Sequence, residues 1–365
     1  MSDQQRKRNR LRSFSARLVL VVASFLFALV VLELALRLAP RPVAYLHFAR
    51  PAIYRADADL VYSLRPGAGG HNSLGMREEE IGPKDDRLRI LVLGDSYTYG
   101  HGVPRRSAYP QLLEQALNRG AGRGARFEVL NAGVPGYSFD QEFALFTRRL
   151  LATAPDLLVI VFEPKDLGAS NVLYTLRDGA LVPVSAWRNW VYLQLRLRTD
   201  VPPLLKMTRL YAFTVGRLPE SDPFRLLPSR DRDELIEWQI DKILRMLGEL
   251  RALGERRGFE VLIVNFPDRA TLDYGGDYRH TTYFRHPVRI LGDNANQHME
   301  RLLDGIAGSG VYFFDALEAL LALGWEAGEY AELYLRDDPH MSERGNQLLA
   351  ALVADYITEN ALQRP

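Results

Sequence analysis

Short apolar runs alternate along this chain with longer stretches whose apolar residues recur at helical spacing. The strand-like runs are Leu88–Leu93, Phe127–Leu130, Leu157–Phe162, Glu260–Asn265 and Val311–Phe314. The helical stretches are Tyr109–Asn118, Asp140–Ala152, Asp231–Arg257, Ile290–Ile306 and Gly345–Glu359. Strands that alternate with helices indicate a parallel sheet covered on both faces. Because crossover connections are right-handed, the sequence predicts an α/β fold of three layers with a doubly wound, flavodoxin-like parallel sheet.

The bulk composition is that of a globular protein and excludes several classes of function. The chain has 365 residues, of which 47% are hydrophobic and 25% are charged. Its formal net charge of +1 gives no electrostatic reason to expect a nucleic acid partner. Because the chain has no cysteine, disulfides, thiolate catalysis and cysteine-ligated metals are excluded.

The amino-terminal residues predict a membrane anchor. Residues 1–17 are rich in arginine, and residues 18–39 are mostly apolar and close to the ~20 residues that cross a bilayer. Because basic flanks stay in the cytoplasm, we expect a cytoplasmic tail over 1–17 and a transmembrane signal anchor over 18–39. The membrane would be a bacterial inner membrane, with the remainder of the chain periplasmic or extracellular. A cleaved signal peptide and a peripheral amphipathic helix are the alternatives.

Two further segments divide the rest of the chain. Residues 40–69 contain several prolines and predict an extended stalk, which leaves 70–365 as the folded domain. The alternation of strands and helices breaks at about residues 172–228, where tryptophans, prolines and basic residues gather. This insertion either packs over the site or faces the membrane, or it forms a structural excursion with its own small core.

A serine directly after the first predicted strand of the sheet is the first candidate for chemistry. Gly94, Asp95 and Ser96 follow that strand and precede a helix-like stretch. The carboxyl ends of parallel strands are where open α/β sheets bind ligands. Far downstream, Asp337 and His340 supply an acid and an imidazole three residues apart. A hydroxyl, an imidazole and a carboxylate are the parts of a nucleophilic triad.

Three blocks, in the right order and on the expected elements, resemble the SGNH/GDSL hydrolase superfamily. They are Gly94-Asp95-Ser96-Tyr97-Thr98, which fits the pattern G-D-S-x-[ST], Asn131-Ala132-Gly133-Val134-Pro135-Gly136, and Asp337-x-x-His340 followed by Gly345 and an apolar helix. Asn72-Ser73-Leu74-Gly75-Met76-Arg77 also resembles an element of membrane-anchored bacterial members. The resemblance covers residues 70–360.

The resemblance implies a serine hydrolase that acts on ester bonds, and the sequence gives no reason to expect a metal or an organic cofactor. Ser96 is then the nucleophile, His340 its general base and Asp337 the acid that orients His340. Asp338 lies nearer to His340 in sequence, but the family spacing favours Asp337, and Asp338 is expected to be solvated. The backbone N–H groups of Ser96 and Gly136 are the expected donors to the oxyanion.

The block after the middle strand departs from the family pattern. Lys165 stands where the family has an asparagine that donates to the oxyanion. Three alternatives stay open: Lys165 donates in its place, Lys165 pairs with Glu163 or Asp166, or Asn171 loops back into the site. Lys165 is retained as the candidate third donor of the oxyanion hole.

The expected function is that of an extracytoplasmic, membrane-anchored serine esterase acting on an ester of a cell-surface glycan or lipid. An O-acyltransferase, such as an O-acetyltransferase of an exopolysaccharide or other envelope glycan, shares the acyl-serine intermediate and is the first alternative. A catalytically inactive glycan-binding or scaffold relative is the second. The expected partners are a small-molecule or glycan ester and the membrane, with no nucleic acid, while protein partners in the envelope stay open.

Overall fold

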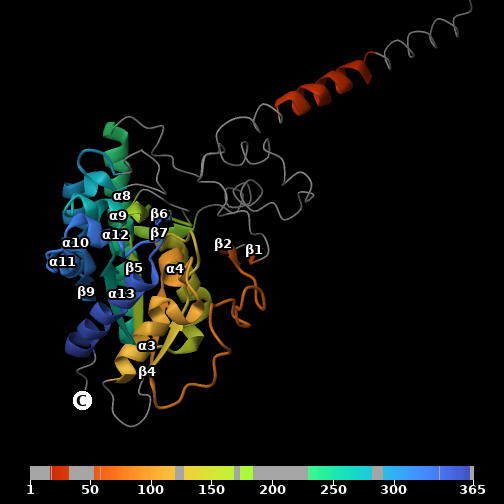
Figure 1. Ribbon diagram of the computed structural model, residues 1–365. Helices are drawn as coiled ribbons and strands as arrows, with labels where there is room; N and C mark the ends of the chain where they lie inside the picture. The colour runs from red at the N-terminus through yellow and green to blue at the C-terminus, as the bar shows by residue number, and fades with distance from the viewer. Residues whose placement is uncertain are drawn as a thin grey trace, which may run out of the picture. The chain divides into compact units, whose positions relative to one another are not determined.

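Figure 1 shows a computed structural model of the chain, which describes residues 17, 19–32, 53–57, 59–119, 127–167, 173–183, 229–281, 291–336 and 338–361. The contacts divide the chain into two units, residues 1–49 with 198–220 and residues 50–197 with 221–365. In the first unit, residues 19–32 are helical. Within the described ranges, no helix is both long and apolar enough to cross a membrane. The predicted anchor, 18–39, lies partly outside those ranges.

The second unit is built on a parallel sheet of five strands. They are β3 (Leu88–Leu93), β4 (Phe127–Asn131), β5 (Leu157–Phe162), β8 (Glu260–Asn265) and β9 (Tyr312–Asp315), in the order β4-β3-β5-β8-β9. This is the flavodoxin-like order, in which the chain first moves one way from β3 and then the other. The predicted α/β fold with a doubly wound parallel sheet is confirmed.

Helices cover both faces of this sheet (Figure 1). The longer ones are α3 (Tyr109–Arg119), α4 (Phe139–Leu145), α8 (Ser229–Arg257), α10 (Ala295–Ala307) and α13 (Glu343–Tyr356). Helix α3 packs against α13, and α8 packs against α4 and α10. Helix α3 connects β3 to β4 on one side of it, whereas α4, α8 and α10 connect strands that follow one another in the opposite direction across the sheet. Because these crossovers are right-handed, α3 lies on one face of the sheet and the other three helices lie on the opposite face. The shorter helices are α2 (Ser96–Tyr99), α9 (Arg269–Asp273), α11 (Ala316–Leu321) and α12 (Ala327–Ala331).

The central strands form the core because both of their faces are covered. Every residue of β5 is buried, and Ile90–Leu93 of β3 are fully buried. A strand buried on both faces reads as a continuous apolar run, which is why these strands were recognisable from the sequence. The stretch predicted over 140–152 is helical throughout, but the type of helix changes: α4 ends at Leu145, a π-helix spans Phe146–Leu150 and a 3-10 helix spans Leu151–Thr153.

The predicted stalk over 40–69 is wrong for its described part. Strands β1 (Tyr54–Asp57) and β2 (Val61–Leu64) pair as an antiparallel hairpin, in which Tyr54, Val61, Tyr62 and Leu64 are buried. The hydroxyl of Tyr62 donates to the carbonyl of Pro135 at 2.9 Å. The folded unit therefore begins before residue 70, because the hairpin is buried against it.

The predicted insertion is described only in part. Residues 173–183 form a second hairpin, β6 (Tyr174–Arg177) and β7 (Ala180–Pro183). The side-chain carboxylate of Asp140 in α4 accepts the backbone N–H groups of Leu173 and Tyr174, at 3.0 and 3.1 Å, and so ties this hairpin to the domain. Residues 184–228 lie outside the described residues.

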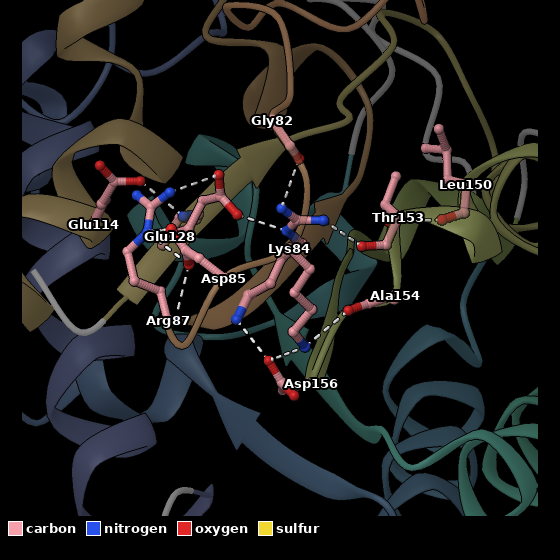
Figure 2. A network of polar contacts seen from close by, with 12 residues as sticks. Gly82, Lys84, Asp85, Arg87, Glu114, Glu128, Leu150, Thr153, Ala154 and Asp156 are labelled. Atoms are coloured by element: carbon pink, nitrogen blue, oxygen red, sulfur yellow. Dashed lines mark hydrogen bonds and ion pairs between the residues drawn. The ribbon is translucent and has the colours of Figure 1, made fainter.

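Charged side chains join the amino ends of the central strands (Figure 2). The Nζ of Lys84 lies 2.6 Å from Oδ2 of Asp156, and that oxygen also accepts the backbone N–H of Arg89 at 2.7 Å. The buried guanidinium of Arg89 donates to Glu128 in β4 and to the carbonyl of Thr153. Ion pairs therefore stabilise the amino edge of the sheet.

Candidate active site

A tight turn at the end of β3 carries Ser96. Gly94 has a φ of +154°, and a Cβ built on it would lie 2.1 Å from Oγ1 of Thr98, so only glycine fits there. The carboxylate of Asp95 caps α2 by accepting the backbone N–H of Tyr97 at 2.8 Å. Ser96 is then the first residue of α2 and is only 4% exposed.

The hydroxyl of Ser96 and the ring of His340 meet, although they are 244 positions apart in the chain. Oγ of Ser96 lies 2.8 Å from Nε2 of His340. The loop before α13 brings His340 to the carboxyl edge of the sheet, where its side chain is buried. A serine hydroxyl within hydrogen-bond distance of an imidazole is the arrangement in which the imidazole can take its proton.

The acid that contacts His340 is Asp338, so the prediction of a solvated Asp338 is wrong. Oδ1 of Asp338 contacts Nδ1 of His340 and also accepts the backbone N–H of His340 at 2.9 Å. The cause is local: an aspartate that accepts the N–H two residues on closes an Asx turn, and Pro339 favours an extended Asp338. Asp337 lies outside the described residues, and its role stays a prediction.

Two aromatic side chains that the sequence analysis did not assign pack against His340. Tyr97 lies with its ring centroid 5.6 Å from that of His340, and its hydroxyl donates to the carbonyl of Pro339 at 2.8 Å. The ring of His101 lies closer, at 4.4 Å between centroids. Tyr97 is the residue after Ser96, and His101 lies five positions after Ser96. Residues close to Ser96 in the chain therefore pack against the ring of His340.

His101, Asp338 and His340 could also hold a cation. One ligand atom from each lies within 4.8 Å of the others, and two imidazoles with a carboxylate are a donor set that suits zinc. Both ring nitrogens of His340 are already used, one by Ser96 and one by Asp338. An ion bound there would displace one of these contacts.

The loop after β4 lies close to α2 and to the turn that carries Ser96. A Cβ on Gly133 would lie 2.3 Å from the backbone nitrogen of Tyr99, so this glycine allows the loop to touch α2. The backbone N–H of Val134 donates to the carbonyl of Gly94 at 3.0 Å. Gly136, predicted as an oxyanion donor, has a φ of +79°, a conformation that glycine adopts without strain. Its role as a donor stays a prediction, as does that of the N–H of Ser96.

The ammonium of Lys165 is held between two carboxyl groups, one of which belongs to Asp95, the residue before Ser96. Its Nζ lies 2.6 Å from Oδ2 of Asp95 and also contacts Oε2 of Glu163, with the side chain only 12% exposed. This matches the alternative in which Lys165 pairs with Glu163, and adds Asp95 as a partner that the sequence analysis missed. The ammonium is thus used for carboxyl groups rather than aimed at an oxyanion. Asn171 lies outside the described residues.

Burial and neighbouring charges shift the pKa values of the groups in this cluster. Burial raises the pKa of Glu163 well above its ordinary value, and the negative charge of Asp95 raises it further. Burial acts on Asp95 in the same direction, but the charge of Lys165 and hydrogen bonds hold its pKa below the ordinary value. Burial would lower the pKa of Lys165, but Asp95 and Glu163 keep it raised. These directions favour an anionic Asp95, a cationic Lys165 and a neutral Glu163.

Two more buried carboxyl groups lie around Lys165. Burial raises the pKa of Asp166 to about 7, against the opposing charge of Lys165. Burial raises the pKa of Glu142 well above its ordinary value, and among the described residues neither carboxyl oxygen of Glu142 has a hydrogen-bond partner. Lys165 therefore faces several acids, and burial favours the neutral form of Glu163, Asp166 and Glu142.

No family model and no curated protein matches the chain. Three solved structures illustrate what it resembles. A protein described as lipolytic and of the G-D-S-L family, from Desulfitobacterium hafniense, is 11% identical over 74% of this chain and 99% of its own, with a TM-score of 0.39. The acetyl xylan esterase AlAXEase is 14% identical over 74% and 100%, with a TM-score of 0.41. Axe2, an acetylxylan esterase from Geobacillus stearothermophilus, is 16% identical over 74% and 94%, with a TM-score of 0.41.

Proposed function

We propose that this chain is an SGNH-type serine esterase whose nucleophile is Ser96, with His340 as its base and Asp338 as the acid that orients His340. The observation that carries the proposal is the 2.8 Å contact between Oγ of Ser96 and Nε2 of His340, at the carboxyl edge of a parallel sheet. The contact of Asp338 with Nδ1 supports it, because a carboxylate there stabilises the imidazolium that forms when His340 takes a proton.

The reaction follows from these positions. As Oγ of Ser96 bonds to the ester carbonyl carbon, its proton passes to Nε2 of His340, and the carbonyl oxygen becomes an oxyanion. Collapse of this intermediate expels the alcohol, which takes the proton from His340. Water then repeats the sequence on the acyl-serine and releases the acid. The backbone N–H groups of Ser96 and Gly136 are the proposed oxyanion donors. Each such donor typically stabilises the transition state by about 3–4 kcal/mol.

We also propose that the site works outside the cytoplasm, on an ester of a cell-surface glycan or lipid. The support is in the sequence: an arginine-rich tail precedes the mostly apolar residues 18–39. An O-acyltransferase would use the same acyl-serine and differ only in the acceptor, a sugar hydroxyl in place of water. A non-catalytic relative has no need of the contact between Ser96 and His340.

Covalent labelling tests the proposal. The full-length chain is treated with a fluorophosphonate probe and assayed with nitrophenyl acetate, beside Ser96→Ala and His340→Ala. We expect labelling and turnover in the parent and neither in the two variants. Ser63→Ala removes another buried serine hydroxyl, which accepts from Arg55, and is the matched control that keeps its label.

Each other outcome has a definite meaning. Labelling that survives in Ser96→Ala contradicts the assignment of the nucleophile. No labelling and no turnover in the parent favour the non-catalytic relative. An acetylated product that forms only when a sugar acceptor is added identifies a transferase.

A further inference from the structure

Lys165 and Asp95 join the carboxyl ends of the two strands at the centre of the sheet. Asp95 follows β3 and Lys165 follows β5, and these strands are neighbours whose residues Leu93 and Ile160 lie side by side. The chain reverses its direction of winding between β3 and β5, which is the position where sheets of this kind bind ligands. The ion pair therefore lies next to the turn of Gly94, Asp95 and Ser96.

We propose that Lys165 is a positioning residue for the nucleophile: with Glu163 it holds the carboxylate of Asp95, and that carboxylate fixes the turn that carries Ser96. This inference rests on the proposed function. It replaces the role of oxyanion donor that the position of Lys165 in the sequence suggested.

The carboxylate of Asp95 has contacts on both sides of the turn. Its Oδ1 accepts the backbone N–H of Tyr97 at 2.8 Å, which starts α2. Its Oδ2 lies 2.6 Å from Nζ of Lys165 and 3.3 Å from Oγ of Ser96. A movement of the ammonium would therefore move the carboxylate, the start of α2 and the hydroxyl together.

The charge of Lys165 matters as much as its position. The buried carboxylate of Asp95 lies next to Ser96, where negative charge develops on the substrate oxygen during acyl transfer. Two like charges this close oppose each other strongly at low dielectric. An ammonium against the carboxylate removes this opposition, and removing one partner of a buried pair leaves the other charge uncompensated.

A double-mutant cycle separates this role from that of an oxyanion donor. The variants are Lys165→Met, Asp95→Asn and the two combined, each measured by kcat, KM and the rate of fluorophosphonate labelling. Asn still caps α2 and carries no charge. We expect Lys165→Met to lower kcat by about tenfold or more with little change in KM. The double variant should label at least about tenfold faster than Lys165→Met, because neither charge is left unpaired.

The donor role predicts the opposite result. If Lys165 donates to the oxyanion, the double variant lacks the donor too and labels no faster than Lys165→Met, which overturns the inference. If Lys165→Met cannot be purified folded, the double variant is compared with the parent: labelling within about tenfold supports the inference, and slower labelling overturns it.

Two controls complete the test. Lys84→Met with Asp156→Asn removes an ion pair of the same 2.6 Å separation at the other edge of the sheet, and should leave kcat unchanged. The parent is labelled first. A parent that does not label contradicts the proposed function, whereas a labelled parent without rescue in the double variant contradicts only the role of Lys165.

Discussion

Asp338 and Asp337 are adjacent acids with different expected roles, and substitution separates them. Asp338→Asn removes the charge that stabilises the imidazolium of His340, so kcat should fall by about 10²–10⁴-fold. Asp337→Asn is the matched neighbour and should change kcat by less than about threefold, as typical for a residue outside the reacting set. Both are measured with nitrophenyl acetate. A large loss at Asp337 with little at Asp338 would restore the spacing-based assignment.

Single residues were predicted from the sequence where their chemistry identifies them. Ser96 and His340 were predicted because a serine after a β strand and a downstream acid-x-x-histidine block have few other uses together. The contact of Asp338 depends on an Asx turn, which spacing alone does not reveal. The pairing of Lys165 with Asp95 could not be predicted, because the partner comes from a neighbouring strand 70 positions away.

At the scale of elements, the contact between the β4 loop and α2 should be sensitive to one methyl group. Gly133→Ala puts a Cβ against the backbone nitrogen of Tyr99, and we expect a loss of about 1–3 kcal/mol of unfolding free energy together with slower labelling of Ser96. Gly248→Ala is the control: it lies in α8 with open space around it, and should gain about 0.5–1 kcal/mol. Denaturant unfolding measures both. If Gly133→Ala left the free energy of unfolding unchanged, α2 would be able to move away from the added methyl group without cost.

Strands were predicted well where burial on both faces gives continuous apolar runs. They were predicted poorly where short strands are stabilised by tertiary contacts. β3, β5 and β8 begin and end at the predicted residues. The hairpin β1–β2 was missed because its strands are short and are stabilised by distant partners, such as the carbonyl of Pro135 for Tyr62. The segment 72–77 was recognised only as a resemblance. The structure gives a physical reason: Arg77 donates to the carbonyls of Tyr99 and Gly100 at the end of α2.

The stability of the whole molecule should depend on pH through Glu78. Its carboxyl accepts the backbone N–H of Asn131 at 2.9 Å and contacts Gln111, and burial raises its pKa from 4.5 to about 7. The folded state therefore binds a proton more tightly than the unfolded state. This contribution is complete below pH 4.5 and is lost as the pH rises to about 7, at a cost of about 3 kcal/mol.

Glu78→Gln removes this dependence. The difference in unfolding free energy between about pH 4.5 and pH 7 should shrink by up to about 3 kcal/mol relative to the parent. Glu79→Gln, which removes an exposed carboxylate beside Arg105, is the matched control and should follow the parent curve. Denaturant titrations across this range decide the matter. Parallel curves for the parent and Glu78→Gln would mean that Glu78 titrates alike in both states.

The hairpin β1–β2 also has a mechanical consequence. Tyr62 is bonded to the carbonyl of Pro135, the residue immediately before Gly136. Tension applied to the chain ahead of residue 54 would load that bond and the strand pairing of the hairpin before it strained the five-stranded sheet. The first part of the domain to yield under such a pull would therefore be the junction beside the Gly136 peptide, with the sheet behind it still intact.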